Sequence, residues 1–134
     1  MKKEYIPKNK IKDREKAIFK QIYNSTVIKR NRKNRIIGDI TLEDFIFLSK
    51  QPCNYCGMVG SNLAKDRRGG GIYSKGKLVS DTCISFNGLD RLDSNKFYTK
   101  ENVTPCCKYC NTAKNTMTKQ EFLNWIKKVY EYNF

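Results

Sequence analysis

The chain has 134 residues, with 27 lysines and arginines against 13 aspartates and glutamates, and it contains no histidine. Without an imidazole the sequence excludes the Ser-His-Asp triad, the Cys-His nucleophile pair, the zinc finger of two cysteines and two histidines, and histidine-bound catalytic zinc. The formal charge of +14 favours a polyanionic partner, of which nucleic acid is the commonest. No apolar stretch is long enough to span a bilayer, and the start lacks the apolar core of a signal peptide, so we expect a soluble, intracellular protein.

The first part of the chain predicts a basic amphipathic helix. Apolar residues such as Ile18, Phe19 and Val27 recur at helical spacing over 13–28. The run that follows, over 29–35, contains five cations: Lys29, Arg30, Arg32, Lys33 and Arg35. This run is expected to bind nucleic-acid phosphates, with a solvated linker or frayed helix end as the alternative.

The middle of the chain predicts short elements. Thr41 and Asp44 are typical of a capped helix start, which predicts a helix over 41–50. The other expected elements are a loop over 57–76, one or two strands within 77–91, a turn over 93–96 and a strand near 102–104. The GGG at 69–71 is expected to be flexible linker, because no helix with the phosphate-binding pattern follows it.

The C-terminal part predicts a helix over 118–130. Thr118 and Glu121 form a capping box at its start. Five apolar residues then repeat at helical spacing, and we expect them to be core rather than a base-stacking platform: Phe122, Trp125, Ile126, Val129 and Tyr130.

Four of the six cysteines have the spacing of metal ligands. Cys53 and Cys56 form one C-x-x-C pair, and Cys107 and Cys110 form another about 50 residues later. Two such pairs supply the four thiolates of a tetrahedral structural zinc site, and reducing compartments favour metal over disulfides. Buried free thiols or a disulfide pair are the alternative. Because sulfur would fill all four positions, the expected role is to join the two segments and not to catalyse.

The remaining cysteines and the residues after the second pair have separate expected roles. Three residues separate Cys106 from Cys110, rather than the two of the C-x-x-C pairs, so Cys106 is not expected to be a ligand, and Cys106 and Cys83 are both expected in the core. If the zinc fixes the start of a helix, Asn111 and Lys114 share one face with Asn115 and could present an oxygen ligand and a cation to a phosphate.

The order of these motifs over 53–115 resembles that of the HNH endonucleases, also called ββα-metal nucleases, in the form with a four-cysteine zinc site. The motifs are Cys-x-x-Cys, Gly-Leu-Asp-Arg-Leu-Asp, Tyr-Thr-x-Glu-Asn and Pro-Cys-Cys-x-x-Cys-Asn-x-x-Lys. The resemblance implies an α+β fold, with a small zinc-containing nuclease domain over 41–134 and flanking helices. Residues 1–40 would then be a basic helical extension.

The resemblance also implies roles for individual residues. The family's histidine base would stand at Arg91, but a histidine-less branch has an Asp-Arg pair and a tyrosine, which correspond here to Asp90, Arg91 and Tyr98. Asp90 and Asn111 would hold a catalytic Mg²⁺ or Mn²⁺. Asn102 would support the loop between the strands.

The chemistry of these residues agrees with the roles that the resemblance implies. Oxygen ligands suit Mg²⁺, and Arg91 can grip a phosphate oxygen. Nearby cations would favour the phenolate of Tyr98, which could then deprotonate or orient water. The alternatives are turn and cap roles for Asp90 and Asn111, a packed aromatic at Tyr98, and a salt bridge between Arg91 and Asp93.

The sequence therefore predicts a metal-dependent endonuclease that acts on double-stranded DNA, with no membrane partner and a possible homodimer. A viral or phage origin is compatible with this prediction. The rival hypothesis is a catalytically inactive, zinc-stabilised protein that binds nucleic acid through its basic surface.

Overall fold

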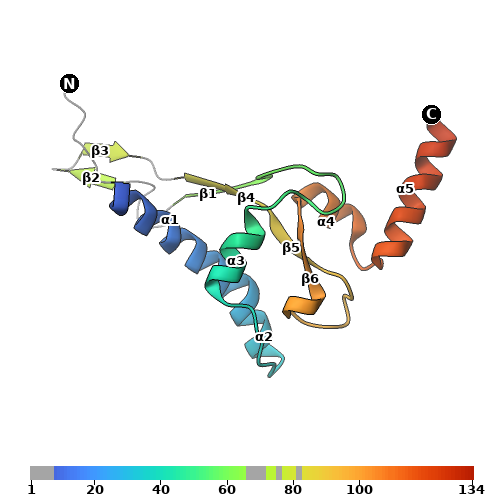
Figure 1. Ribbon diagram of the computed structural model, residues 1–134, viewed down its shortest axis with the longest axis horizontal. Helices are drawn as coiled ribbons and strands as arrows, with labels where there is room; N and C mark the ends of the chain where they lie inside the picture. The colour runs from blue at the N-terminus through green and yellow to red at the C-terminus, as the bar shows by residue number, and fades with distance from the viewer. Residues whose placement is uncertain (1–7, 66–71, 75–76, 81–82) are drawn as a thin grey trace.

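The computed structural model describes residues 8–65, 72–74, 77–80 and 83–134 (Figure 1). The GGG at 69–71 lies outside this part of the chain. Within the described residues, no helix combines the length and the apolar character needed to cross a membrane.

A continuous helical arm opens the structure. It consists of α1 (Lys8–Tyr23), the π-helical turn η1 (Asn24–Ile28) and α2 (Lys29–Lys33). The arm begins before the predicted residue 13, and it extends through most of the basic run, so the run is helical and not a linker. In the π-helical turn the Lys29 N–H donates to the Asn24 carbonyl, five residues back. Within η1 and α2, Val27 and Asn31 are buried.

The predicted helix after Thr41 is confirmed as α3 (Leu42–Ser49). The Thr41 hydroxyl accepts from the Asp44 N–H at 3.1 Å, and the Asp44 carboxylate accepts from the Thr41 N–H at 2.9 Å. This capping box satisfies two of the backbone donors that a helix start leaves free. Phe45 is fully buried against the arm, where its ring contacts Tyr23.

Two small antiparallel pairs of strands follow. They are β1 (Asn62–Lys65) with β4 (Cys83–Phe86), and β2 (Ile72–Ser74) with β3 (Lys77–Ser80). Strands β3, β4 and a further strand over 88–91 lie within 77–91, where one or two strands were predicted, and β1 and β2 lie where a loop was expected. Hydrogen bonding to partner strands outweighs the local signal of glycines and charges there, because strand propensity depends strongly on context.

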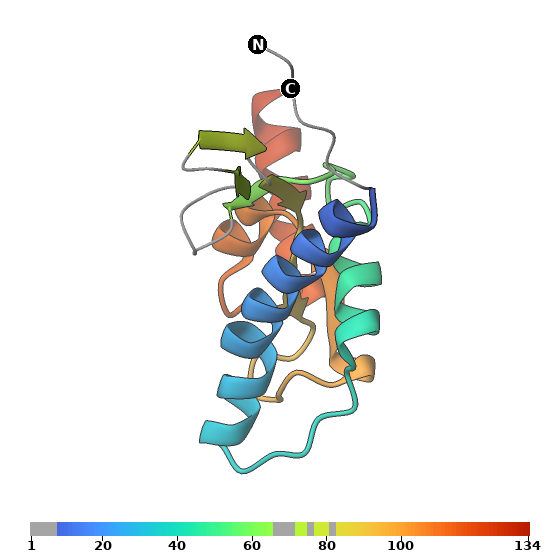
Figure 2. The ribbon, with the colours of Figure 1, turned by 90° about the vertical axis from the view of Figure 1, so that its left-hand side faces the viewer.

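A ββα unit forms the centre of the molecule (Figures 1 and 2). It consists of β5 (Gly88–Arg91), the short turn η2 (Lys100–Asn102), β6 (Val103–Cys106) and α4 (Lys108–Lys114). Strands β5 and β6 are antiparallel, with Asp90 opposite Thr104. The Asn102 side-chain amide donates to the carbonyls of Asp93 and Phe97, and its oxygen accepts from the Asp93 N–H. These are the bonds expected of a residue that supports the loop between the strands.

One hydrophobic core joins the helical arm to the strands. Its buried members are Ile18, Phe19, Val27, Ile40, Phe45, Ile84, Leu89, Tyr98 and Val103. Residues before and after position 40 therefore share the same core, and the arm packs as an integral layer on α3 and the strands.

The C-terminal helix α5 (Lys119–Asn133) corrects one prediction. Its capping box is present, with Thr118 and Glu121 bonded to each other's backbone N–H groups. However, only Phe122 of the five expected core residues is buried, and the other four are exposed. Helical periodicity predicts an apolar face but not what covers that face. Here the buried residue, Phe122, lies in the first turn of the helix, where its ring contacts Tyr55.

Candidate metal centre and neighbouring site

The four predicted ligand cysteines come together where the loop after α3 meets the start of α4. Cys53 and Cys56 lie in the loop, Cys107 is the N-cap residue of α4, and Cys110 lies within its first turns. All four sulfur atoms lie within 4.8 Å of one another, and the sulfurs of Cys56 and Cys107 are 3.5 Å apart. Segments about 50 residues apart in the sequence thus share one cluster of thiols.

The cluster fits a tetrahedral zinc ion. Zinc-sulfur bonds of about 2.3 Å place tetrahedral sulfurs about 3.8 Å apart, in agreement with the observed spread. Burial alone would raise the pKa of the Cys53 thiol, but backbone N–H groups, led by that of Cys107, lower this pKa to about 6. Zinc binds thiolates, so the N–H groups directed at the Cys53 sulfur favour the form of this ligand that binds the metal, whereas burial raises the pKa of the Cys110 thiol.

The two other cysteines have different environments. Cys106 is buried as predicted, and its sulfur lies 3.4 Å from the carbonyl oxygen of Cys107. Burial raises the pKa of its thiol, which keeps it protonated. Cys83 was predicted in the core but is exposed, because it is the first residue of β4 and its side chain faces outward.

Asp90 lies beside the cluster in a buried polar network. Asp90 is 4% exposed, and its carboxylate accepts a 2.8 Å hydrogen bond from the Tyr55 hydroxyl. The ammonium of Lys114, which is fully buried, lies 3.2 Å from the same carboxylate and 3.3 Å from the Arg91 carbonyl oxygen. Burial raises the pKa of Tyr55, and the bond to Asp90 and the charge of Asp90 add to this rise, so Tyr55 remains a donor.

The structure separates the two side chains of α4 that were expected to act together. Lys114 points inward and is paired with Asp90, so it does not present its charge to solvent as expected for a phosphate contact. Asn111 is exposed on the same helix, one turn from the buried lysine. The expected pairing of Asp90 with Asn111 around a cation therefore joins a buried carboxylate to an exposed amide.

Tyr98 is held by the helical arm. Its hydroxyl accepts a 2.7 Å hydrogen bond from the Arg30 guanidinium, which also lies over its ring. Asn31 bonds the backbone of Tyr98 twice, because its amide donates to the Tyr98 carbonyl at 3.0 Å and its oxygen accepts the Tyr98 N–H at 3.3 Å. Gly38 fits here because a Cβ would lie 2.4 Å from the Asn31 amide nitrogen.

Arg91 completes a cationic environment around Tyr98. Its guanidinium lies 5.5 Å from the centre of the Tyr98 ring, and one of its nitrogens donates to the Lys96 carbonyl at 3.2 Å. Arg30 and Arg91, which are 61 positions apart in the sequence, thus contact the same aromatic ring. This arrangement combines a hydroxyl with two cations that can attract a phosphate.

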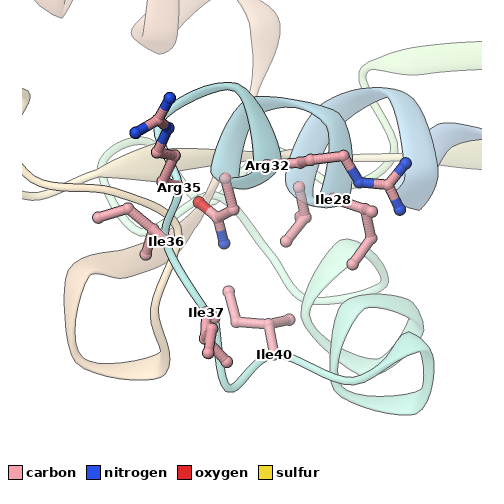
Figure 3. Close-up of a pocket in the computed structure, with 9 residues that line it drawn as sticks. Ile28, Arg32, Arg35, Ile36, Ile37 and Ile40 are labelled. Atoms are coloured by element: carbon pink, nitrogen blue, oxygen red, sulfur yellow. The ribbon is translucent and has the colours of Figure 1, made fainter.

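A pocket of about 430 Å³ lies at the end of the arm, and Asn31 is one of the residues that line it. Isoleucines line much of it, and Arg32 and Arg35 project to opposite sides of it (Figure 3). Lys29, Arg32, Lys33 and Arg35 are all exposed. The predicted basic run therefore has two roles: these four cations face solvent, while Arg30 and Asn31 hold Tyr98.

Sequence reasoning missed three contributions to this site. Tyr55 was seen only as a residue between two cysteines, and Tyr109 has the equivalent position in the second pair but is exposed. The sequence offers no signal that separates the two tyrosines. Asn31 was passed over within a charged run, and Arg30 was assigned to phosphate binding, because contacts to a residue 67 or 68 positions away leave no local pattern.

Comparison with known proteins gives one informative likeness. No protein-family model matches the sequence, and no curated protein sequence matches it. Among solved structures the chain is similar to the rare-cutting HNH restriction endonuclease PacI, with a TM-score of 0.51 and 17% sequence identity. The match covers 87% of this chain and 78% of that chain. At this identity the likeness concerns the fold, and with the ββα unit and the cysteine cluster it indicates an HNH-like fold.

The cysteine cluster predicts a defined metal content. We expect one zinc per purified chain by elemental analysis. Cys107→Ser should lose the zinc and with it folding free energy on the order of 10 kcal/mol, because binding and folding are coupled at such sites. Cys83→Ser is the matched control, and it should keep the metal and the thermal midpoint of the wild type. Equal zinc content in all three proteins would contradict the assignment.

Proposed function

We propose that the protein is a metal-dependent DNA endonuclease that hydrolyses phosphodiester bonds. The observation that carries the proposal is the position of Asp90 and Arg91 on β5 of the ββα unit, between the thiol cluster and Tyr98. The fold likeness to an HNH restriction endonuclease supports it. The charge of +14 supports a polyanionic substrate, and double-stranded DNA is the form that we propose.

Each residue then has a chemical role. Arg91 and Arg30 attract the scissile phosphate, and Arg91 grips a non-bridging oxygen. Tyr98 orients or deprotonates the attacking water, and its hydroxyl oxygen is held in place by Arg30. Asp90 and Asn111 would hold Mg²⁺ or Mn²⁺, which supplies stabilisation of the charge that builds on the phosphate and the leaving oxygen.

The contacts that Asp90 already makes affect how a metal ion could bind to its carboxylate. Tyr55 and Lys114 already contact the carboxylate, but a carboxylate offers about four acceptor positions. A divalent cation at Asp90 would face the Lys114 ammonium across the same group, and like charges at that distance repel. We therefore propose that cation binding moves the Lys114 ammonium away from Asp90, toward the Arg91 carbonyl that it already contacts.

The rival function is a zinc-stabilised protein that binds nucleic acid without cutting it. The specific observation in its favour is the same buried pair, because Lys114 balances the charge of Asp90 without a metal. In that protein Asp90 would be a structural residue. The exposed cations of the basic run would then carry the whole function.

The proposed function first predicts that changes at Asp90 and Asn111 abolish cleavage without unfolding the protein. Plasmid cleavage with Mg²⁺ or Mn²⁺ should disappear in Asp90→Asn and in Asn111→Ala, while Asn124→Ala, on the exposed polar side of α5, should cleave like the wild type. Because Asp90→Asn leaves a buried ammonium without its partner, Asp90→Asn/Lys114→Met serves as a second variant with a balanced core. Cleavage by the Asp90 variants, or by none of the proteins, would overturn the proposal in favour of the rival function.

The second prediction concerns the contact between Arg30 and Tyr98. Tyr98→Phe and Arg30→Gln should each slow single-turnover cleavage by about 10²-fold, the usual size of an acid-base contribution. The double variant should be little slower than either single one, since both remove the same interaction. Arg32→Gln, an exposed neighbour, should change DNA affinity and leave the single-turnover rate unchanged. Additive effects of the Arg30 and Tyr98 changes would argue against a shared role.

The third prediction concerns salt. The slope of log affinity against log salt should fall by about 0.9 for each phosphate contact removed when Lys29, Arg32, Lys33 and Arg35 are changed to Gln. Lys119→Gln, Lys127→Gln and Lys128→Gln on α5 are the controls, and they should leave the slope nearly unchanged. A slope that is insensitive to the basic run would place the DNA contact on another surface.

A further inference from the structure

Tyr55 connects the thiol cluster to the candidate catalytic carboxylate. It lies between two of the predicted zinc ligands, Cys53 and Cys56, and its backbone N–H donates to the Cys53 sulfur at 3.4 Å. Its hydroxyl donates to Oδ2 of Asp90 at 2.8 Å, since a carboxylate that is paired with a lysine can only accept. One side chain therefore joins the two places at which a metal ion is expected.

The position of Tyr55 is fixed from three directions. The cysteine pair holds its backbone. The N–H of the preceding residue, Asn54, donates at 2.9 Å to the Pro105 carbonyl on β6, the strand that pairs with β5. The ring packs edge-on against the buried Phe122 of α5, with the ring centres 5.3 Å apart. A side chain held in this way directs its hydrogen bond at one oxygen of Asp90 and does not follow the carboxylate as it turns.

The two oxygens of Asp90 have unequal contacts. Oδ2 accepts from Tyr55 and lies 3.2 Å from the Lys114 ammonium. Oδ1 lies 3.4 Å from the same ammonium, which is at the long end of hydrogen-bond distances. The ammonium is also shared with the Arg91 carbonyl, 3.3 Å away. Tyr55 therefore retains Oδ2, while Oδ1 keeps more of its capacity to accept a further positive group.

Loss of the Tyr55 hydroxyl would change the balance between the carboxylate and the buried ammonium. With Oδ2 released, the Asp90 carboxylate can turn toward Lys114 and form a closer contact, because opposite charges attract strongly in a buried site. A divalent cation would then have to displace a tighter ion pair. The hydrogen bond from Tyr55 thus favours the binding of a cation at Asp90.

We propose that Tyr55 is a positioning residue, which holds the Asp90 carboxylate in the orientation that binds the divalent cation and limits its pairing with Lys114. This role rests on the proposed function, because it concerns the cation that Asp90 would hold. Residues that hydrogen-bond a metal ligand typically contribute about 10- to 100-fold to metal affinity. The loop that carries two zinc ligands thereby also sets the affinity of a separate cation site.

The test measures Mn²⁺ binding to the full zinc-loaded chain directly, by electron paramagnetic resonance in the absence of DNA. Tyr55→Phe keeps the ring that packs on Phe122 and should weaken Mn²⁺ affinity by about 10-fold or more, with unchanged zinc content. The Mn²⁺ concentration that gives half-maximal plasmid cleavage should rise by the same factor, while the rate at saturating Mn²⁺ stays close to that of the wild type. A purely structural role would instead lower the rate at every Mn²⁺ concentration.

Tyr109→Phe is the matched control. Tyr109 has the equivalent place in the second cysteine pair but is 60% exposed, so this variant should bind Mn²⁺ like the wild type. Lys114→Gln tests the mechanism, because it removes the ammonium toward which Asp90 would turn. In that background the effect of Tyr55→Phe on Mn²⁺ affinity should be much smaller, as a double-mutant cycle would show.

The outcomes separate this role from the proposed function. If Asp90→Asn loses Mn²⁺ binding and cleavage while Tyr55→Phe retains wild-type values of both, the positioning role is overturned and the proposed function stands. An equal effect of Tyr55→Phe with and without the Lys114 ammonium also overturns the role. A wild type that neither binds Mn²⁺ nor cleaves DNA overturns both.

Discussion

The thiol cluster is the constraint on which the rest of the structure depends. Four sulfurs within 4.8 Å of one another place the loop after α3 against the start of α4, the helix of the ββα unit. Tyr55 lies inside one cysteine pair and contacts both Asp90 and Phe122. The hydrogen bond from Tyr55 to Asp90 and the ring contact of Tyr55 with Phe122 therefore tie both the candidate catalytic carboxylate and the start of α5 to this cysteine pair.

The helical arm is the second half of the candidate site. Arg30 bonds the Tyr98 hydroxyl, and Asn31 fixes the backbone of the same residue. A site assembled from two parts of the chain is formed only when the core between them is complete. This gives the arm a structural reason to be part of the HNH-like fold, in addition to the charge that it carries.

Local patterns predicted those parts of the molecule that local chemistry determines. The capping boxes at Thr41 and Thr118 are present, and the two C-x-x-C pairs meet, as their metal-ligand spacing predicts. The resemblance indicated the ββα unit, in which Asn102 bonds the loop. Long-range contacts were not predictable, since the burial of Lys114, the exposure of α5 and the choice of Tyr55 over Tyr109 depend on how distant segments pack.

The π-helical turn between α1 and α2 affects where the helical arm can tolerate the loss or gain of a residue. A residue more or fewer in a helix rotates everything beyond it by about 100°, because an α-helix advances by that angle at each residue. The turn Asn24–Ile28 is an exception, because a π-helical turn is wider than an α-helical one and already accommodates an extra residue. Loss of one residue there can be absorbed by a return to α-helical winding, so Arg30 and Asn31 would keep facing Tyr98. A deletion in α1 would instead rotate Arg30 and Asn31 relative to the buried residues of α1. The turn is therefore the segment of the arm in which a change of length is best tolerated.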